Sequence, residues 1–543
     1  MKVGHGRANL PVPDGTPMGG YLDRPGSSAG LLDPLSVDAI TWFDGERRFA
    51  LATADIICVN EDLAHRVRSD ARSLGCELWL AASHTHSGPE TGCVPGGGPT
   101  PSPWLDRLTE AVGAAVRRAI EDERPCDGEA HHGELHGVGA DRSRPSAPAV
   151  VPLTVIAARY RPVENVGLAD HDDTAENKQL SDRDKPDKNK PLTNHDEPDE
   201  NKPLTNRDKT DESGRLAGVL VVLPVHPTVL PATSRLVSAD LVGAVRRALR
   251  ARLGPDVWAL VATGAAGEIS TRHTRRGQDA AELDRLAAIV ADRCLELLRE
   301  PPTRAWSAGS GITWAARRLD LAPAQLGEEH GSVPVDPVVD PAVNPAIATD
   351  PTANPPVNPT VDPPANPVAS PAMDPATNLA ANPTVDPAAN PAMNPTVDPA
   401  ANPTANPTVD PAMDPAMDPA MLAAELRAAE ATGDPVAVRL ARSRMEGIRA
   451  RRPRADPIGV HVHAARLGEL SVVGLPGEPF LAVAESITPG GPVMVLGYVN
   501  GYPGYLPTAE AYGRAEYEVL VSQVAPGSAE ALAGAARQLL EDM

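Results

Sequence analysis

Two histidines stand one residue apart at the point where an apolar segment stops. His84 and His86 follow "LWLAAS" and precede Ser-Gly-Pro, a combination that ends a strand. Residues two apart on a strand point to the same side, so both imidazoles can face one pocket. Imidazole serves as a zinc ligand and as a general acid or base. A pair of solvent-facing histidines at a strand end is the alternative, and this segment alone leaves both open.

Two more apolar segments end in the same way. One runs through "LAGVLVVLPVHPT" to His226, and the other runs through "VVGLPGEPF" to Glu478. In open α/β sheets, ligands bind beyond the carboxyl ends of the strands, so these ends form one site if the strands are neighbours. Two or three histidines with a carboxylate make up a zinc-hydrolase ligand set that leaves one position open for water. The pattern therefore predicts a Zn²⁺ centre.

Other clustered histidines fit structural roles better. His461 and His463 form a second "HVH" spacing, but no chain break follows, which favours a half-buried structural pair within a strand. His131 and His132 are adjacent in a polar segment that we interpret as a turn, and His136 follows in similar surroundings. Neighbouring residues on an extended chain point apart, so we expect these three to be solvated.

Tyrosine is concentrated in one C-terminal segment, "GYVNGYPGYLPTAEAYGRAEYE". One interpretation is a packed aromatic edge. The other is a set of phenols that ligate a metal ion or donate to a developing oxyanion. The segment holds five of the seven tyrosines of the chain: Tyr498, Tyr502, Tyr505, Tyr512 and Tyr517.

Alternating strands and helices are predicted to position these residues. Asp44-Gly45 is a tight-turn dipeptide between two apolar segments, which predicts a hairpin over 37–58. Strands near 153–160 and from Leu216 are expected to pair as a second hairpin. The alternation indicates an α/β fold with mixed β-sheets flanked by helices. Helices are predicted at 61–73 (with Asn60 as cap), 104–123, 239–253, 279–299, 422–451 and from Ala529.

Two low-complexity tracts interrupt the alternation. Residues 163–213 repeat "NKPLTN" with few aliphatic side chains, and residues 333–421 repeat units such as "NPTVDPAANPAM" with proline every three or four residues. Neither composition supports a packed core, so we expect two long disordered insertions. One catalytic domain is then expected in three parts, 1–162, 214–332 and 422–543.

Composition excludes several classes of protein. The net charge is −22, but the second tract contributes ten Asp and no Lys or Arg, and aromatic residues are only 3% of the chain, so no nucleic-acid surface is indicated. Five scattered cysteines without a CxxC pair argue against a disulfide framework. With no signal-peptide pattern and no long apolar run, we expect a cytoplasmic protein without a transmembrane segment. The oligomeric state is left open.

Several segments, in order along nearly all of the chain outside the tracts, resemble the catalytic domain of the neutral/alkaline, non-lysosomal ceramidase family. Each is weak alone, and their order makes the resemblance specific. They are "GHGRANLPVPDGTPMGGY", "ASHTHSGP", "VGADRSRP", "VHPT", "SADLVG", "TGAAGEIS", "GLPGEPF" and the tyrosine-rich segment.

The resemblance implies a role for each matching residue. A Zn²⁺ ion would be held by His84, His226, Glu478 and Tyr505. His86 is similar to the family's catalytic acid/base, and Arg142 and Tyr517 would bind the substrate carbonyl or oxyanion.

The chain departs from the family pattern at several points. Asp141 stands where the family often has Asn, and Gly267-Glu268 stands where it often has Gly-Asp, so no role is assigned to Glu268. The family's C-terminal immunoglobulin-like domain has no counterpart here. The catalytic residues are therefore better supported than the natural substrate.

The expected activity is zinc-dependent, ceramidase-like hydrolysis of an amide-like N-acyl bond in a small-molecule or lipid-like substrate. The resemblance places that activity in sphingolipid metabolism. The alternatives are a zinc hydrolase of another acyl bond such as an ester, an inactive relative that only binds metal or ligand, and an interaction protein that works through its repeat tracts.

Overall fold

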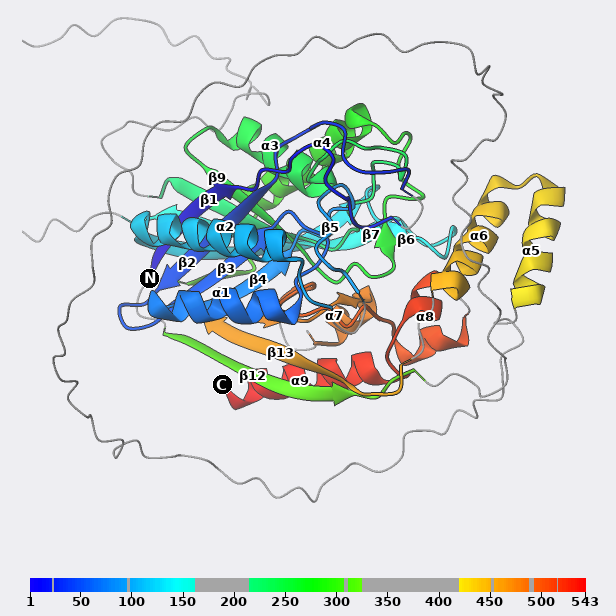
Figure 1. Ribbon diagram of the computed structural model, residues 1–543. Helices are drawn as coiled ribbons and strands as arrows, with labels where there is room; N and C mark the ends of the chain where they lie inside the picture. Colours follow the sequence, from blue (N-terminus) through cyan, green and yellow to red (C-terminus); the bar gives the residue numbers. More distant parts are fainter. Residues whose placement is uncertain are drawn as a thin grey trace, which may run out of the picture. The chain divides into compact units, whose positions relative to one another are not determined.

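The structure is a computed structural model (Figure 1). The described residues belong to one compact unit, drawn from Met1–Leu326 and Met413–Met543. The expected insertion 163–213 lies outside the described residues. The expected insertion 333–421 also lies outside them, except for its last three residues, which begin a helix. The structure describes residues 1–21, 24–94, 98–161, 214–306, 311–324, 419–450, 454–487, 493–514 and 516–543.

A mixed sheet in the order β4-β3-β2-β1-β5-β7-β8-β9, with β11 beside β5, forms the centre of the fold. β1 pairs with β5 only at Lys2–Pro125 and Val3–Arg124, so the sheet consists of two halves that join there. This arrangement confirms the predicted α/β fold with mixed sheets. The strands are β1 (Lys2–Asn9), β2 (Ser36–Phe43), β3 (Arg48–Ala54), β4 (Glu77–Ala82), β5 (Arg124–His136), β7 (Val150–Tyr160), β8 (Leu216–Leu223), β9 (Trp258–Thr263) and β11 (Arg304–Trp306).

Helices α1 (Glu61–Ser73) and α2 (Ser102–Glu121) cover one face of the β1–β4 half (Figure 1). Close approach of α2 depends on glycine in β1. A Cβ at Gly4 would lie 2.0 Å from the carbonyl oxygen of Ala119, and one at Gly6 would lie 2.0 Å from that of Ala115. Small residues on β1 therefore let the helix backbone rest directly on the sheet.

Helices α3 (Asp240–Leu253) and α4 (Ala280–Arg299) pack against the β5–β9 half. Strands β7 and β8 pair antiparallel, which confirms the second predicted hairpin. β8 then runs parallel to β9. Because apolar side chains on both faces of β8 are buried, its sequence is continuously apolar instead of alternating.

A second sheet, in the order β12-β13-β14-β16, packs against the inner face of the large sheet. Trp79 of β4, Leu220 of β8 and Val472 of β14 belong to one buried cluster, which holds the two sheets together. The outer face of the second sheet is covered by α7 and α9. These elements are β12 (Ile312–Leu321), β13 (Ile458–Leu467), β14 (Leu470–Gly474), β16 (Val493–Leu496), α7 (Leu481–Ile487) and α9 (Ser528–Asp542).

Short elements complete the C-terminal part and the surroundings of the site. The single helix predicted over 422–451 is wrong, because the chain breaks at Gly433 (φ 68°). It forms α5 (Pro419–Thr432) and α6 (Pro435–Ala450). The remaining elements are β6 (Ala140–Asp141), β10 (Ile269–Ser270), β15 (Glu478–Pro479), β17 (Tyr505–Leu506), the 3₁₀ helix η2 (Ala509–Gly513) and α8 (Tyr517–Val521).

The interpretation of His131 and His132 as solvated turn residues is wrong. Both lie within the long strand β5, which begins at Arg124, and His131 is only 2% exposed. Polar and small residues alternate along β5 because only some of its side chains are buried. His461 and His463 lie in the middle of β13, the first exposed and the second buried, which confirms the half-buried pair.

Buried ionic contacts connect β2 and the end of β3 to α3. The Arg246 guanidinium lies 2.6 Å from Asp55 Oδ2 and 3.4 Å from Asp38 Oδ2. His5 Nε2 lies 3.2 Å from Asp38 Oδ1. Burial alone would raise the pKa of Asp38, but the His5 hydrogen bond and the Arg246 charge hold it well below its usual range.

Asp38→Asn is expected to lower the free energy of unfolding by about 3 kcal/mol near neutral pH, because it leaves the buried Arg246 charge underpaired. A depressed folded-state pKa means that the stabilisation is complete above the ordinary value of 3.8 and is lost as the pH falls below it. The difference in unfolding free energy between Asp38→Asn and the wild type should therefore be smaller when urea unfolding is measured at about pH 3. Asp106→Asn, which breaks an exposed pair with Arg66, is the control. An equal deficit at both pH values would contradict the assignment.

None of the helices in the described part of the chain is long and apolar enough to cross a membrane.

Candidate active site

His84 lies just beyond β4 in a left-handed backbone conformation (φ 62°). Its backbone amide donates to the carbonyl oxygen of Ile56 at 3.0 Å, and the preceding Ser83 amide donates to that of Ala54 at 2.8 Å. Its Nδ1 lies 2.6 Å from the carbonyl oxygen of Ile57 and donates to it. Because Nδ1 is held by this carbonyl oxygen, Nε2 of the buried imidazole faces the site.

His226 follows β8 and is held in the same manner. Its amide donates to the carbonyl oxygen of Ile269 at 2.8 Å, and its Nδ1 donates to that of Ala266 at 2.7 Å. Burial, reinforced by the charge of Arg142, lowers the pKa of His226 to about 4, so the ring is neutral at physiological pH. Its unprotonated Nε2 lies 3.0 Å from Nε2 of His84.

Glu478 reaches the same point from the segment that follows β14 of the second sheet. It begins β15, which pairs in parallel with β17 and places Glu478 beside Tyr505. The preceding Gly477 (φ 60°) has no room for a side chain, because a Cβ there would lie 2.4 Å from the carbonyl oxygen of Gly504. Glu478 Oε2 lies 3.2 Å from Nε2 of both His84 and His226.

These three atoms can hold a cation. Two imidazole nitrogens and a carboxylate oxygen face one another at 3.0–3.2 Å in a buried site. Glu478 Oε2 is buried and accepts no hydrogen bond from any described residue. Lone pairs that converge in a buried site repel unless a positive charge lies between them. The residues therefore fit a metal ion, and His-His-Glu is a ligand set that zinc accepts.

His86 completes the cluster of histidines. His84, His86 and His226 are buried, their ligand atoms lie within 4.8 Å of one another, and together they can hold a metal ion. His86 Nε2 lies 3.4 Å from Nε2 of His84, whereas its buried Nδ1 has no partner among the described residues. Burial holds the pKa of His86 well below its ordinary value. The geometry therefore allows His86 to act either as a ligand or as a proton acceptor.

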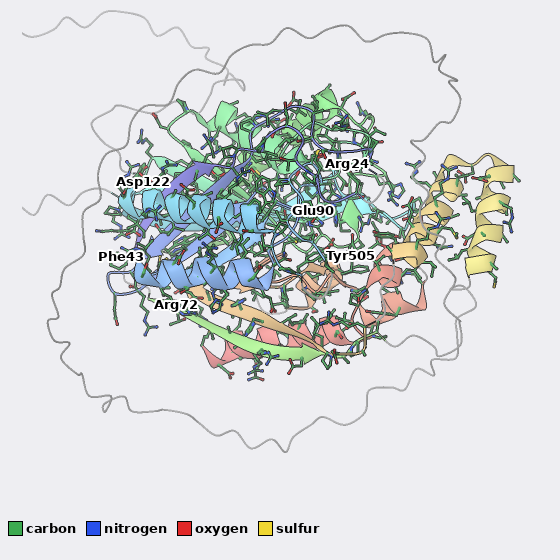
Figure 2. All side chains as sticks on the ribbon, in the orientation of Figure 1. Arg24, Phe43, Arg72, Glu90, Asp122 and Tyr505 are labelled. Carbon is green, nitrogen blue, oxygen red and sulfur yellow. The ribbon has the colours of Figure 1, made fainter. Side chains whose placement is uncertain are left out.

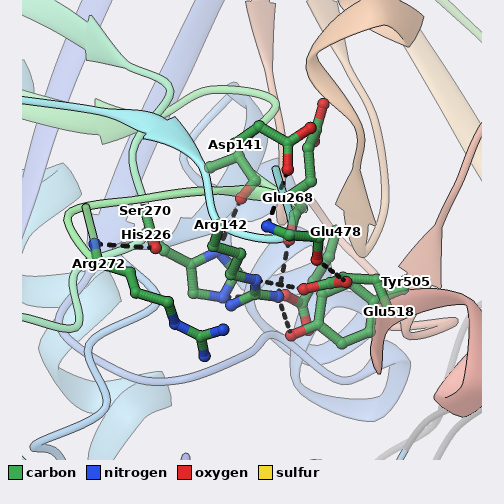
Figure 3. A network of polar contacts seen from close by, with 12 residues as sticks. Asp141, Arg142, His226, Glu268, Ser270, Arg272, Glu478, Tyr505 and Glu518 are labelled. Atoms are coloured by element: carbon green, nitrogen blue, oxygen red, sulfur yellow. Dashed lines mark hydrogen bonds and ion pairs between the residues drawn. The ribbon is translucent and has the colours of Figure 1, made fainter. Parts of the chain in front are cut away.

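Arg142 follows β6 and anchors a buried polar network beside the histidines (Figure 3). Its Nη2 donates to the hydroxyl of Tyr505 at 2.9 Å and to the carbonyl oxygen of Gly267 at 2.8 Å. Its Nε donates to the buried carboxylate of Glu518. The guanidinium is thus fixed in orientation, with the Tyr505 ring parallel to the His226 imidazole at a centroid separation of 6.4 Å.

Tyr517 begins α8 and stands edge-on to Tyr505, with ring centroids 6.1 Å apart. It is half-buried. Burial raises the pKa of Tyr517 to about 12, so at neutral pH the hydroxyl keeps its proton and can donate it. The site therefore brings together all seven residues singled out in the sequence.

The residues converge although the strands that precede them are not neighbours, which was the condition for the expected site. β4 and β8 are not adjacent strands, and β14, which precedes Glu478, belongs to the second sheet. The site lies where strand ends of both sheets meet. In Figure 2, Phe43, Arg72 and Asp122 lie well away from Arg24, Glu90 and Tyr505, as expected for a site at the carboxyl ends of β3 and β4.

Three aromatic residues of the site were not assigned a role from sequence. The Tyr502 hydroxyl donates to Glu478 Oε1 at 2.6 Å, and the Tyr498 ring lies 4.3 Å from the His84 ring. Tyr21 packs on His86 with ring centroids 4.9 Å apart. The clustering of tyrosines in the C-terminal segment could have indicated Tyr502 and Tyr498 from sequence. The "GGY" segment could have indicated Tyr21.

Tyr502→Phe is expected to weaken metal affinity about 10- to 100-fold, because it removes the hydrogen bond that orients Glu478. Tyr498→Phe is the matched control. Its buried hydroxyl has no partner among the described residues, so its loss should leave affinity and stability nearly unchanged. Competition with a fluorescent zinc chelator measures both affinities. Equal affinities for the two variants would show that Tyr502 does not position Glu478.

Comparison with known proteins gives no match to any protein-family model or curated protein. Among solved structures, the chain is similar to the neutral ceramidase of Pseudomonas aeruginosa, with a TM-score of 0.58 and 13% identity over 99% of this chain and 73% of that one. It is also similar to a ceramidase complexed with C2, with a TM-score of 0.59 and 15% identity over 100% of this chain and 75% of that one. The chain has the neutral ceramidase fold. At this sequence identity the likeness shows the fold alone. The ceramidase resemblance of the sequence is therefore confirmed for the fold.

Proposed function

We propose that this protein is a zinc-dependent hydrolase of an amide-like N-acyl bond, with a small-molecule or lipid-like substrate. The observation that carries the proposal is the convergence of His84 Nε2, His226 Nε2 and Glu478 Oε2 within 3.0–3.2 Å. The fold shared with ceramidases supports the choice of an amide bond. The proposal assigns the catalytic unit to the three parts 1–162, 214–332 and 422–543, each of which contributes residues to the site.

In this proposal His84, His226, Glu478 and Tyr505 hold Zn²⁺. A zinc ion bound there supplies a Lewis acid and lowers the pKa of water to about 7. Arg142 holds the Tyr505 hydroxyl by its 2.9 Å hydrogen bond. Burial raises the pKa of Tyr505 well above its ordinary value, and the Arg142 charge acts against that rise.

The remaining polar groups serve the reacting amide. Tyr517, with its protonated hydroxyl, would donate to the carbonyl oxygen as negative charge develops there. Arg142 would stabilise the same charge through its fixed guanidinium. His86 is neutral and has a free Nδ1, so its imidazole can take up a proton and deliver it to the departing amine.

Metal removal tests the proposal. Purified protein is expected to contain about one zinc per chain by mass spectrometry of metals. Dialysis against a chelator should abolish cleavage of a fluorogenic N-acyl amide, and one equivalent of zinc should restore it. The matched fluorogenic ester is assayed in parallel. If only the ester is cleaved, the scissile bond of the substrate is an ester bond and not an amide bond. Full amidase activity without metal would overturn the mechanism.

A further inference from the structure

One arginine near the site has no counter-ion in the part of the chain that the structure describes. Arg272 follows β10 by two residues, and its backbone amide donates to the Ser270 hydroxyl at 3.2 Å. Ser270 in turn pairs with His226 in an isolated β-bridge. Figure 3 shows the Arg272 side chain on the same side as His226 and Arg142, with no dashed line to its guanidinium. No described residue forms a hydrogen bond or ion pair with that guanidinium.

The surroundings of Arg272 are cationic. Burial, with repulsion from the Arg142 guanidinium, lowers the pKa of Arg272 to about 10. Arg275 and Arg439 add further positive charge, whereas the nearby acid Glu518 is already paired with Arg142. The local charge is therefore opposite in sign to the net charge of −22 of the whole chain.

The Arg272 side chain is partly exposed, so an anion from solvent can reach its unpaired guanidinium and form charge-assisted hydrogen bonds with it. Guanidinium groups recognise carboxylate and phosphate with paired hydrogen bonds. The acids near Arg272 on neighbouring elements do not serve this purpose. Asp141 accepts from Arg144, and Glu268 accepts from the Leu481 amide.

We infer that Arg272 is a specificity-determining residue that binds an anionic group, a carboxylate or a phosphate, of the N-acyl substrate. The inference rests on the proposed amide hydrolysis and narrows it to acidic N-acyl amides, of which N-acyl amino acids are the simplest. The bond that breaks is unchanged. The acidic group only orients the amide, and Arg272 takes no part in proton transfer.

Matched substrates that differ only in charge provide the test. N-lauroylglycine is compared with N-lauroylglycinamide, and N-lauroylethanolamine phosphate with N-lauroylethanolamine. The wild type should prefer the acidic member of one pair by about 10- to 100-fold in kcat/KM, mainly through KM. The pair that shows the preference identifies the anion as carboxylate or phosphate.

Variants assign the preference to Arg272. Arg272→Gln should bring the acid-to-neutral ratio to within about 3-fold of unity, and Arg272→Lys should restore part of it. Arg276→Gln alters an exposed arginine four residues later in the chain and should keep the wild-type ratio. Equal ratios in the wild type and Arg272→Gln, with amide hydrolysis intact, would overturn the inference and leave the proposed function standing.

Binding measurements distinguish failure of the anion subsite from failure of the proposed hydrolase activity. Calorimetry measures the affinity of the zinc-loaded protein for N-lauroylglycine and N-lauroylglycinamide, and likewise for the phosphate pair, whether or not they are cleaved. An Arg272-dependent preference for an acid without cleavage would support the anion subsite and refute the hydrolase. No charge preference in binding or in cleavage would refute the subsite.

Discussion

Glu478→Gln is expected to abolish metal binding and to reduce amide hydrolysis at least about 1000-fold, because the metal supplies several kcal/mol of transition-state stabilisation. The amide of Gln has nearly the shape of the carboxylate but lacks its charge. Glu478 is the only carboxylate at the point where His84 and His226 converge within the described residues. Metal content after purification and steady-state rates on a fluorogenic amide measure the two effects.

The same variant should make the metal-free protein more stable than the wild type. In the wild type, Nε2 of His84, Nε2 of His226 and Oε2 of Glu478 face one another at 3.0–3.2 Å. The Gln amide group can turn so that its NH₂ donates to His84 or His226, which satisfies a buried acceptor and relieves the repulsion. A gain of about 1–2 kcal/mol in unfolding free energy is expected for protein kept in chelator.

Opposite effects on metal binding and stability distinguish this centre from a structural hydrogen-bond cluster. If Glu478 only accepted hydrogen bonds from protonated histidines, Glu478→Gln would destabilise the protein and metal content would not matter. Glu510→Gln is the matched control, since Glu510 lies on the surface in an ion pair with Arg514 and is 89% exposed. It should leave the metal content, the rate and the stability close to those of the wild type.

Local chemistry was predictable from sequence where a single stretch of chain sets it. Turn residues located the β2–β3 hairpin in this way. His84 and His86 do meet in one cluster as expected, but His84 lies beyond β4 in a left-handed conformation, so the two-residue period of a strand is not the reason. The ring of His84 is oriented by the Ile57 carbonyl oxygen, and Gly477 is required by the close approach of Gly504, so both depend on segments elsewhere in the chain.

Interactions between distant segments were not predictable in this way. Glu518 adjoins Tyr517 in sequence, yet nothing local indicates that its carboxylate is buried against Arg142, 376 residues away. The sheet order likewise depends on how the two sheets pack, so the ends of β4, β8 and β14 meet although these strands are not the neighbours that the expected site required. His131 shows the same limit, because a polar segment became a buried strand through pairing with β7.

Arg142→Met is expected to lower amide hydrolysis about 100- to 1000-fold and the unfolding free energy by about 3–5 kcal/mol, for two separate reasons. Catalysis loses a donor to the developing negative charge and the hydrogen bond that fixes Tyr505. Stability falls because Glu518, only 1% exposed, keeps a buried charge without its partner. Rates and urea unfolding together report on both.

A double variant separates the two effects. Arg142→Met combined with Glu518→Met replaces the buried ion pair by apolar side chains of similar volume, which is often neutral or stabilising. Stability should return to within about 1 kcal/mol of the wild type, whereas hydrolysis should stay as low as in Arg142→Met alone. Recovery of activity along with stability would show that Arg142 serves only to hold the fold. Loss of activity in a fully stable double variant would place the guanidinium in the chemistry itself.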